Sequence, residues 1–268
     1  MLKSSQPIGI FDSGVGGLTV LREIKRLLPQ EDLLYLGDTA RVPYGTRSPK
    51  TVMRYSERNT EFLVKKGIKL LVVACNTSSA VSLELLRTKN TIPVIGVIEP
   101  GAKKAVELTK NGIIGVIGTE ATIRSQAYQE AIKRLAQGKR IQVIGQACPL
   151  FVPLVEEGWI DDPITKEVAR RYLNPLMEKG IDVLVLGCTH YPLLEKVIRE
   201  VLGSGVTLIN SAKETAEEVK RVLESLSLRR KKGTGRTTFY VTDNPEKFRY
   251  LGELFLGEKP KEVEEIDL

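Results

Sequence analysis

Two of the three cysteines are the residues best placed to do chemistry in this sequence. Cys75 follows the apolar run Leu70–Ala74, and Cys188 follows the similar run Val183–Leu186 and Gly187. In both places polar residues come next, and the pattern of a helix begins a few residues later. Apolar runs of this kind are typical of buried strands, and ligands of open α/β sheets bind where such strands end. The sequence therefore predicts one site with two facing thiols.

Each of these cysteines has an acid–base neighbour. His190 is the only histidine of the chain and lies two residues after Cys188, so it is the natural proton partner of that thiol. Asp12 ends the first predicted strand and is the matching neighbour for Cys75. A helix N-terminus and a nearby cation both lower the pKa of a thiol from about 8.5 toward neutrality. Cys148, which is followed by Pro149, is instead interpreted as a small buried hydrophobe.

Two thiols across a cleft suit only some reactions. A zinc site wants four ligands, usually with a close-spaced cysteine pair, and the sequence has no such pair, so we expect no metal. A Cys–His hydrolase or transferase would use Cys188 and leave Cys75 idle. Inversion of a carbon centre needs a base on one face and an acid on the other, which a thiolate and a thiol supply. A catalytically silent amino-acid-binding protein remains a third class.

Composition excludes several other classes of protein. The 268 residues are 42% hydrophobic and 27% charged, as in ordinary soluble domains, and no apolar run approaches the ~20 residues that span a bilayer. The first residues contain no apolar signal segment, so we expect a cytoplasmic protein without a membrane partner. The net charge is +7, but lysines and arginines alternate with glutamates. We therefore expect no nucleic-acid partner and interpret the basic run Arg229–Lys232 as a mobile solvated loop.

Strands and helices alternate along the chain, and the pattern begins again at residue 113. Ile113–Ile117 resembles Ile8–Phe11, and Thr119 precedes Cys188 at nearly the spacing that separates Asp12 from Cys75. The prediction is an α/β fold of two pseudo-symmetric, doubly wound lobes with mostly parallel sheets and an active-site cleft between them. Strands are expected at Ile8–Phe11, Leu33–Leu36, Leu70–Ala74, Val94–Ile98, Ile113–Ile117, Ile141–Ala147, Val183–Leu186, Val206–Ile209 and finally Thr238–Val241. Helices are expected around Leu18–Leu28, Pro49–Lys66, Glu167–Lys179, Ala212–Leu226 and finally Pro245–Leu254, with helix starts also at Ser78 and Pro192.

Two loops of the first repeat are good candidates for ligand binding. The glycine-rich turn Asp12–Gly17 precedes a helix and would present backbone N–H groups to an anion. It is not a dinucleotide fingerprint, because Thr19 stands at the third glycine position, so a carboxylate-bearing substrate is favoured. The segment Gly37–Gly45 is too long and polar for a simple connector, and such loops often carry function.

Five segments between residues 11 and 192 resemble the signatures of glutamate racemases: FDSGVGGLTV, LGDTARVPYG, VVACNTSSA, GTEATIRSQAY and LGCTHYP. The resemblance implies interconversion of L- and D-glutamate without any cofactor, supplying D-glutamate for peptidoglycan. Aspartate racemases usually carry a glutamate where this chain has His190, so glutamate is favoured over aspartate, the alternative substrate.

The resemblance also implies roles for individual residues. Cys75 would take the α-proton of D-glutamate with help from Asp12, and Cys188 that of L-glutamate with help from His190 and Glu156. The C-terminal segment would return to the first lobe, giving lobes at residues 1–98 plus 208–268, with Cys75, and at 99–207, with Cys188. We also expect a homodimer. The residues expected to hold the substrate are Asp12, Ser13, Tyr44, Gly45, Asn76, Thr77, Thr119, Thr122, Thr189 and His190.

Overall fold

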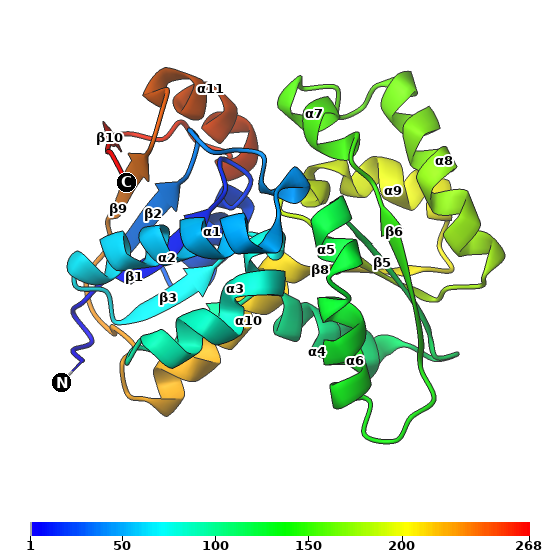
Figure 1. The fold of residues 1–268 in the computed structure, drawn as a ribbon, viewed down its shortest axis with the longest axis horizontal. Helices are drawn as coiled ribbons and strands as arrows, with labels where there is room; N and C mark the ends of the chain where they lie inside the picture. The colour runs from blue at the N-terminus through cyan, green and yellow to red at the C-terminus, as the bar shows by residue number, and fades with distance from the viewer. Residues whose placement is uncertain (1) are drawn as a thin grey trace.

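The chain forms two open, parallel β-sheets covered by helices, in a computed structural model that describes residues 2–268 (Figure 1). This arrangement confirms the predicted α/β class with two sheets. The first sheet has the order β10-β9-β2-β1-β3-β4 and the second the order β6-β5-β7-β8. The strands are β1 (Ile8–Asp12), β2 (Leu33–Gly37), β3 (Leu70–Val73), β4 (Val94–Gly96), β5 (Ile113–Gly118), β6 (Gln142–Ala147), β7 (Val183–Gly187), β8 (Thr207–Asn210), β9 (Thr237–Val241) and β10 (Val263–Glu265).

The two sheets repeat one strand order. In the first sheet β2, β1, β3 and β4 are neighbours in that order, and β6, β5, β7 and β8 repeat it in the second. The strands β1, β3 and β7 are buried along their whole length, as expected for parallel strands covered on both faces. The repeated order supports the predicted duplication, and it makes the ends of β3 and β7 equivalent positions.

Helices connect the strands and cover the sheets. We call the first sheet with its helices the first half of the molecule, and the second sheet with its helices the second half. Local signals fix several helix starts: Ser48 accepts the N–H of Thr51 at 3.3 Å, and Asp162 accepts that of Ile164 at 2.7 Å. The first half contains α1 (Leu18–Leu27), α2 (Pro49–Lys65), α3 (Asn76–Lys89), α10 (Ser211–Ser225), α11 (Pro245–Leu256) and a 3-10 helix (Tyr44–Thr46). The second half contains α4 (Ile98–Leu108), α5 (Glu120–Arg124), α6 (Ala127–Leu135), α7 (Phe151–Glu156), α8 (Pro163–Glu178), α9 (Glu195–Leu202) and a 3-10 helix (Tyr191–Leu194).

The C-terminal part of the chain lies against its beginning. The strand β9 pairs with β2, β10 pairs with β9, and α10 packs on α1, so the orange and red segments flank the blue ones (Figure 1). The strand β8, at residues 207–210, pairs with β7 of the second sheet. The lobe bounds 1–98 plus 208–268 and 99–207 stay a proposal.

Some elements differ from the sequence prediction. The apolar run expected as a strand to Ile98 ends at Gly96, because Ile98 already belongs to α4. The helix α4 contains Pro100 and Gly101, two poor helix formers, so its pattern was hidden. Pro192 lies in a 3-10 helix, and α9 begins only at Glu195. The predicted last strand and helix are followed by the short edge strand β10.

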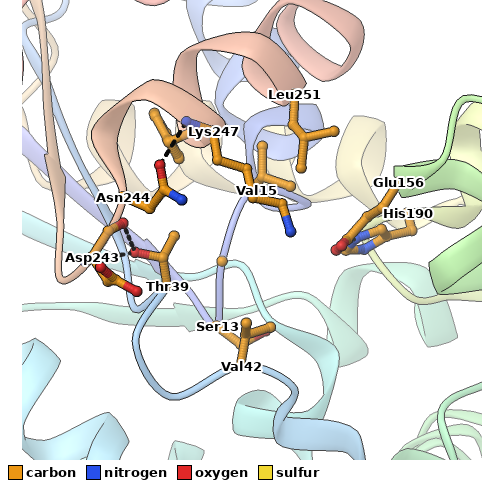
Figure 2. Close-up of a pocket in the computed structure, with 12 residues that line it drawn as sticks. Ser13, Val15, Thr39, Val42, Glu156, His190, Asp243, Asn244, Lys247 and Leu251 are labelled. Carbon is orange, nitrogen blue, oxygen red and sulfur yellow. Dashed lines mark hydrogen bonds and ion pairs between the residues drawn. The ribbon is translucent and has the colours of Figure 1, made fainter.

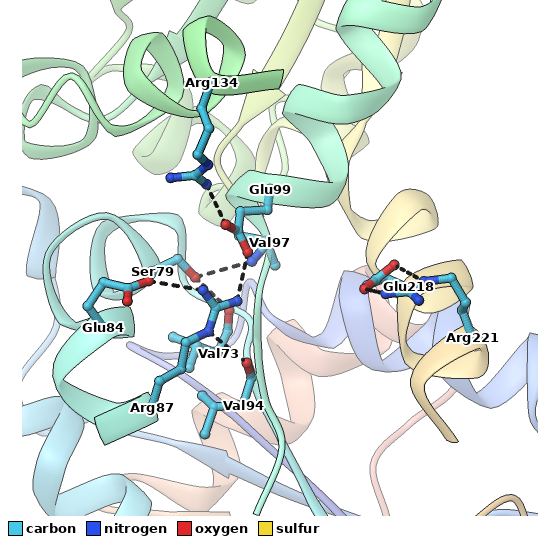
Figure 3. Close-up of polar contacts among 10 residues, drawn as sticks. All are labelled: Val73, Ser79, Glu84, Arg87, Val94, Val97, Glu99, Arg134, Glu218 and Arg221. Carbon is cyan, nitrogen blue, oxygen red and sulfur yellow. Dashed lines mark hydrogen bonds and ion pairs between the residues drawn. The ribbon is translucent and has the colours of Figure 1, made fainter. Parts of the chain in front are cut away.

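An ion-pair cluster joins the halves away from the cysteines. Arg87 on α3 donates to the carboxylate of Glu99 on α4 at 2.7 Å, and Arg134 on α6 binds the other oxygen (Figure 3). All three side chains are at least one-third exposed, so we expect the cluster to contribute little stability.

Two further findings concern partners. Arg229 and Arg230, in the basic run, form ion pairs with Glu224 and Asp32, and the run is therefore held to the rest of the first half. Among residues 2–268, no helix combines the length and the apolar character needed to cross a membrane.

Candidate active site

A cavity of about 400 Å³ lies between the carboxyl ends of the two sheets. Both Cys75, which follows β3, and Cys188, which follows β7, line it. The structure thus brings together the two thiols that the sequence predicted to face one site. Of the other candidates, those that line the same cavity are Ser13, Tyr44, Gly45, Asn76, Thr77, Thr119, Glu156, Thr189 and His190. Asp12 and Thr122 are outside this lining: Oγ1 of Thr122 lies 3.3 Å from that of Thr77, and the charge of Asp12 acts on Cys75.

Cys75 is placed by the start of α3. It is the N-cap of that helix, and the backbone N–H of Ser78 donates to its Sγ at 3.5 Å. The thiol donates to the hydroxyl of Ser13 at 3.7 Å. Burial, and then the charge of Asp12, raise the pKa of Cys75 to about 11, although its contacts with Ser78 and Ser13 oppose the rise. At neutral pH Cys75 is therefore a thiol with a proton to give.

Asp12 is the buried carboxyl group whose charge acts on Cys75. It ends β1, is 1% exposed, and accepts the backbone N–H of Gly14 at 3.0 Å. Burial raises the pKa of this carboxyl group, and the nearby charge of His190 partly opposes that. Its second oxygen, Oδ1, has no hydrogen-bond partner among residues 2–268. A carboxylate that is costly to keep ionised can accept a proton from the neighbouring thiol.

Cys188, His190 and Glu156 form the matching group in the second half. The Nδ1 atom of His190 lies 4.0 Å from Sγ of Cys188, and its Nε2 atom lies 3.0 Å from Oε1 of Glu156. Burial alone would lower the pKa of His190, but its contacts with Cys188 and Glu156 outweigh burial and raise the pKa to about 10. A protonated imidazole places a positive charge close to Sγ of Cys188. The electrostatics of the two thiols therefore differ: one lies near a carboxylate and the other near an imidazolium.

Hydroxyl groups from both halves meet at one wall of the cavity. Oγ1 of Thr77 lies 3.0 Å from that of Thr119 and 3.3 Å from that of Thr122, and the last two are 3.0 Å apart. Thr119 also caps α5 by accepting the N–H of Thr122 at 3.2 Å. Close to this wall, a Cβ at Gly45 would lie 2.9 Å from Cβ of Thr119, so only glycine allows this approach.

The glycine-rich turn after β1 packs against the second half. A Cβ at Gly16 would lie 2.3 Å from Oγ1 of Thr189 and 2.5 Å from Nδ1 of His190. The hydroxyl of Thr19 donates to the carbonyl of Thr189 at 3.0 Å. Sequence reasoning interpreted these glycines as an anion-binding turn, but at Gly16 the structure gives a different reason, which is room for the histidine.

A second cavity of about 200 Å³ lies on the other side of the His190–Glu156 pair. Lys247 on α11 lines it, and Figure 2 shows its side chain extending toward that pair. Its positive charge lowers the pKa of Glu156, in addition to the larger effect of the hydrogen bond from His190. Sequence reasoning missed Lys247, because only the return of the C-terminal segment to the first half brings it here.

The third cysteine matches its sequence interpretation. Cys148 is fully buried, does not line the larger cavity, and donates to the carbonyl of Gln146 at 3.6 Å. Burial raises the pKa of this thiol. All three cysteines are free thiols.

Comparisons with known proteins identify the family of this chain. A family model for Asp/Glu/Hydantoin racemases matches residues 8–219. A glutamate racemase from Geobacter metallireducens is 56% identical over 97% of this chain and 96% of its own length. The chain belongs to the glutamate racemase family.

Solved structures of the family have the same fold as this chain. The glutamate racemase from Thermus thermophilus, in complex with β-chloro-D-alanine, matches with a TM-score of 0.91 at 47% identity, over 99% of this chain and 98% of that one. The glutamate racemase from Francisella tularensis, in complex with D-glutamate, matches with a TM-score of 0.92 at 38% identity, over 98% of each chain. These similarities cover both halves of the fold described above.

Proposed function

We propose that this enzyme interconverts L- and D-glutamate, with Cys188 and Cys75 acting on opposite faces of the α-carbon. One observation carries the proposal: the two thiols follow equivalent strands of the two sheets and line the same cavity. A hydrolase of the Cys–His type would have a use for Cys188 but not for a second thiol across the cavity. Membership of the glutamate racemase family supports glutamate over aspartate as the substrate.

Conversion of L-glutamate begins with the Cys188 thiolate. It takes the α-proton, so that an S–H bond forms, the Cα–H bond breaks, and the electron pair moves into the α-carboxylate. The Cys75 thiol then gives its proton to the opposite face of the α-carbon and becomes a thiolate. The high pKa of Cys75 and the imidazolium beside Cys188 support this starting state, in which the free enzyme is ready for L-glutamate.

Conversion of D-glutamate requires the opposite protonation state. Cys75 must lose its proton, and Asp12 is the base that accepts it, since burial raises the pKa of that carboxyl group. Cys188 must be a thiol, and His190 supplies the proton to it. Glu156 accepts a hydrogen bond from Nε2 of His190 and keeps the ring aimed at Cys188. The two directions of the reaction therefore use two different helper groups.

Neutral groups hold the substrate in this proposal. Hydroxyls, amides and backbone N–H groups bind carboxylates without adding a further positive charge to that of His190 near the thiolate base. These groups come from both halves, so the bound substrate bridges them. The neutral residues that we propose to contact glutamate are Ser13, Tyr44, Gly45, Asn76, Thr77, Thr119 and Thr189, with His190 beside Cys188 and with Asp12 and Thr122 acting from outside the cavity lining.

The cellular setting is part of the proposal. D-glutamate made here would supply peptidoglycan synthesis in the cytoplasm, and the enzyme would act as a homodimer without metal or cofactor. No cluster of three or more His, Cys, Asp or Glu in residues 2–268 is arranged to hold a metal ion. A chelator should therefore leave activity unchanged, and loss of activity that an added metal ion restores would contradict metal independence.

Deuterium incorporation tests the two-thiol reaction. In deuterated water, D-glutamate formed early from L-glutamate should carry deuterium at the α-carbon, because Cys75 has exchanged with solvent. Recovered L-glutamate should carry little, because Cys188 returns the hydrogen that it removed. Cys75→Ala and Cys188→Ala should each abolish net racemisation. Substantial protium in early D-glutamate, or full activity of either variant, would rule out two-base catalysis by these thiols.

A further inference from the structure

One buried tyrosine contacts the segments that carry both thiols. Tyr128 lies on α6 of the second half and is 1% exposed. Its hydroxyl donates to Oδ1 of Asn76 at 2.8 Å, and Asn76 is the first residue of α3, directly after Cys75. The helices α3 and α6 meet where the two halves join (Figure 1). This hydrogen bond therefore crosses between the halves beside the site.

The ring of the same tyrosine packs against the residue before Cys188. A Cβ at Gly187 would lie 3.1 Å from Cε2 of Tyr128 and 2.6 Å from the carbonyl oxygen of Ile117. The carbonyl of Ile117 thus requires glycine at the end of β7, and the ring of Tyr128 packs closely against this glycine. Through its ring and its hydroxyl, Tyr128 fixes the position of Asn76 relative to the backbone that carries Cys188.

The amide of Asn76 makes a hydrogen bond through its oxygen but not, among residues 2–268, through its nitrogen. Asn76 lines the larger cavity, and its Nδ2 atom is buried without a hydrogen-bond partner among residues 2–268. Its Oδ1 atom is engaged by Tyr128, whose pKa is raised by burial, so that the phenol stays protonated and donates. The amide can therefore offer only N–H donors to a ligand. A carboxylate needs such donors, and it would be repelled by the oxygen of an amide turned the other way.

We propose that Tyr128 is a positioning residue for the reaction: it holds the amide of Asn76 with its N–H groups directed to the substrate, at a fixed place relative to Cys188. The proposal rests on the proposed function, because it assigns the amide to a carboxylate of glutamate. It predicts that the tyrosine hydroxyl acts on substrate binding only through Asn76.

A double-mutant cycle tests this dependence. Tyr128→Phe keeps the ring against Gly187 and deletes only the hydroxyl, and we expect it to raise KM for both enantiomers about tenfold, the effect of losing one hydrogen bond. Asn76→Ala should also raise KM. In the double variant the two effects should not multiply, and Tyr128→Phe should change the KM of the Asn76→Ala enzyme by less than about twofold.

Tyr191→Phe is the matched control. It deletes another fully buried hydroxyl of the second half, one that donates to the carbonyl of Cys148 at 2.9 Å. Its effect on KM, whatever its size, should multiply with that of Asn76→Ala, and thermal melts should show both phenylalanine variants folded. Independent effects of Tyr128→Phe and Asn76→Ala, or an unchanged KM in Tyr128→Phe, would overturn the positioning role.

Failure of the proposed function would look different. An unsubstituted protein that does not racemise glutamate would contradict that function. Calorimetry would then measure the Kd of D-glutamate for the same variants. The effects of Tyr128→Phe and Asn76→Ala on Kd should again not multiply, because the tyrosine hydroxyl acts through Asn76.

Discussion

Gly16 and His190 come so close that a Cβ at position 16 would lie 2.5 Å from Nδ1 of the imidazole. This approach joins the turn after β1 of the first half to the residue that we propose assists Cys188 in the second. The nitrogen involved is the one that faces the thiol, at 4.0 Å from Sγ. The position of the imidazole ring thus depends on a glycine that has no side chain of its own.

Gly16→Ala should therefore lower activity. The added methyl group must displace His190 or Thr189, and misplacement of a catalytic group by about 1 Å can cost on the order of 10²-fold in rate. We expect a loss of this order in kcat/KM. Gly14→Ala is the control in the same turn, because its Cβ would meet Val42 at 3.5 Å, an ordinary contact. Equal losses in both variants would show that the turn, and not the approach to His190, is responsible.

The pKa of His190 can be measured directly, since the chain has only one histidine. In an NMR titration its imidazole signals should change near pH 10 and not near the ordinary 6.5. In Glu156→Gln the midpoint should fall, because the hydrogen bond to a carboxylate is one of the causes of the raised pKa. A midpoint near 6.5 in the unsubstituted enzyme would contradict the imidazolium at this site.

The same shift predicts how stability depends on pH. The pKa of His190 is raised in the folded state, so its contribution is fully present below about pH 6.5 and is lost as the pH rises through about 10. Reversible denaturant unfolding should show a stability difference between the enzyme and His190→Asn that shrinks from pH 6.5 to 10. A stability difference that grows over this range would contradict a raised pKa of His190 in the folded state.

His190→Asn should also affect the two directions of turnover unequally. We expect kcat to fall more from L-glutamate than from D-glutamate, because His190 assists Cys188 and loss of a tuned acid–base group commonly costs ~10²–10⁴-fold. The equilibrium constant of racemisation is one, so kcat/KM must fall equally in both directions. Asymmetry can therefore appear only in kcat and KM separately, in initial rates measured from each enantiomer. Unchanged kinetics in both directions would exclude a role for His190.

A buried ion pair far from the cavity should matter for stability alone. Lys69 is fully buried and donates from Nζ to Glu31 at 2.5 Å and to the carbonyls of Ser4 and Leu228. Lys69→Met should cost about 3–5 kcal/mol in the free energy of unfolding, because it leaves the buried carboxylate without its partner. Lys196→Met, at the exposed pair with Asp161, is the control and should change stability little. A large loss of kcat/KM in folded Lys69→Met enzyme would contradict this separation.

Sequence patterns predicted most of the parallel strands and where the two thiols lie. Cys75 and Cys188 could be assigned to strand ends because apolar runs stop just before them, and this kind of pattern is local. The helix α4 could not be assigned, because Pro100 and Gly101 hide its periodicity and packing overrides propensity there. The strand β10 is only three residues long and is defined by backbone pairing with β9.

Contacts between distant segments were beyond the reach of pattern reasoning. Glu156 entered the predicted site only through family resemblance, and its partner His190 is 34 residues away in the chain. Tyr128 ends one of the family-like segments but received no role from the sequence, because its hydrogen bond to Asn76 joins residues 52 positions apart in the chain. Lys247 lies in the C-terminal segment, whose return to the first lobe was implied only by the family resemblance, and nothing in the sequence placed this lysine beside Glu156.

The two halves repeat one strand order, but two identical halves could not form a site for an unsymmetrical substrate. Repeating one unit supplies a thiol from each side of the cavity. The substrate does not share this symmetry, because the two ends of glutamate differ. The rotation that relates the two units also cannot convert one enantiomer into the other. Two identical units would therefore bind the substrate in two competing orientations. Divergence removes that ambiguity: Asp12 ends β1, whereas Gly118 ends the equivalent strand β5 and Thr119 comes next. An unsymmetrical, chiral substrate thus requires the two copies to keep the cysteine in common and to differ around it.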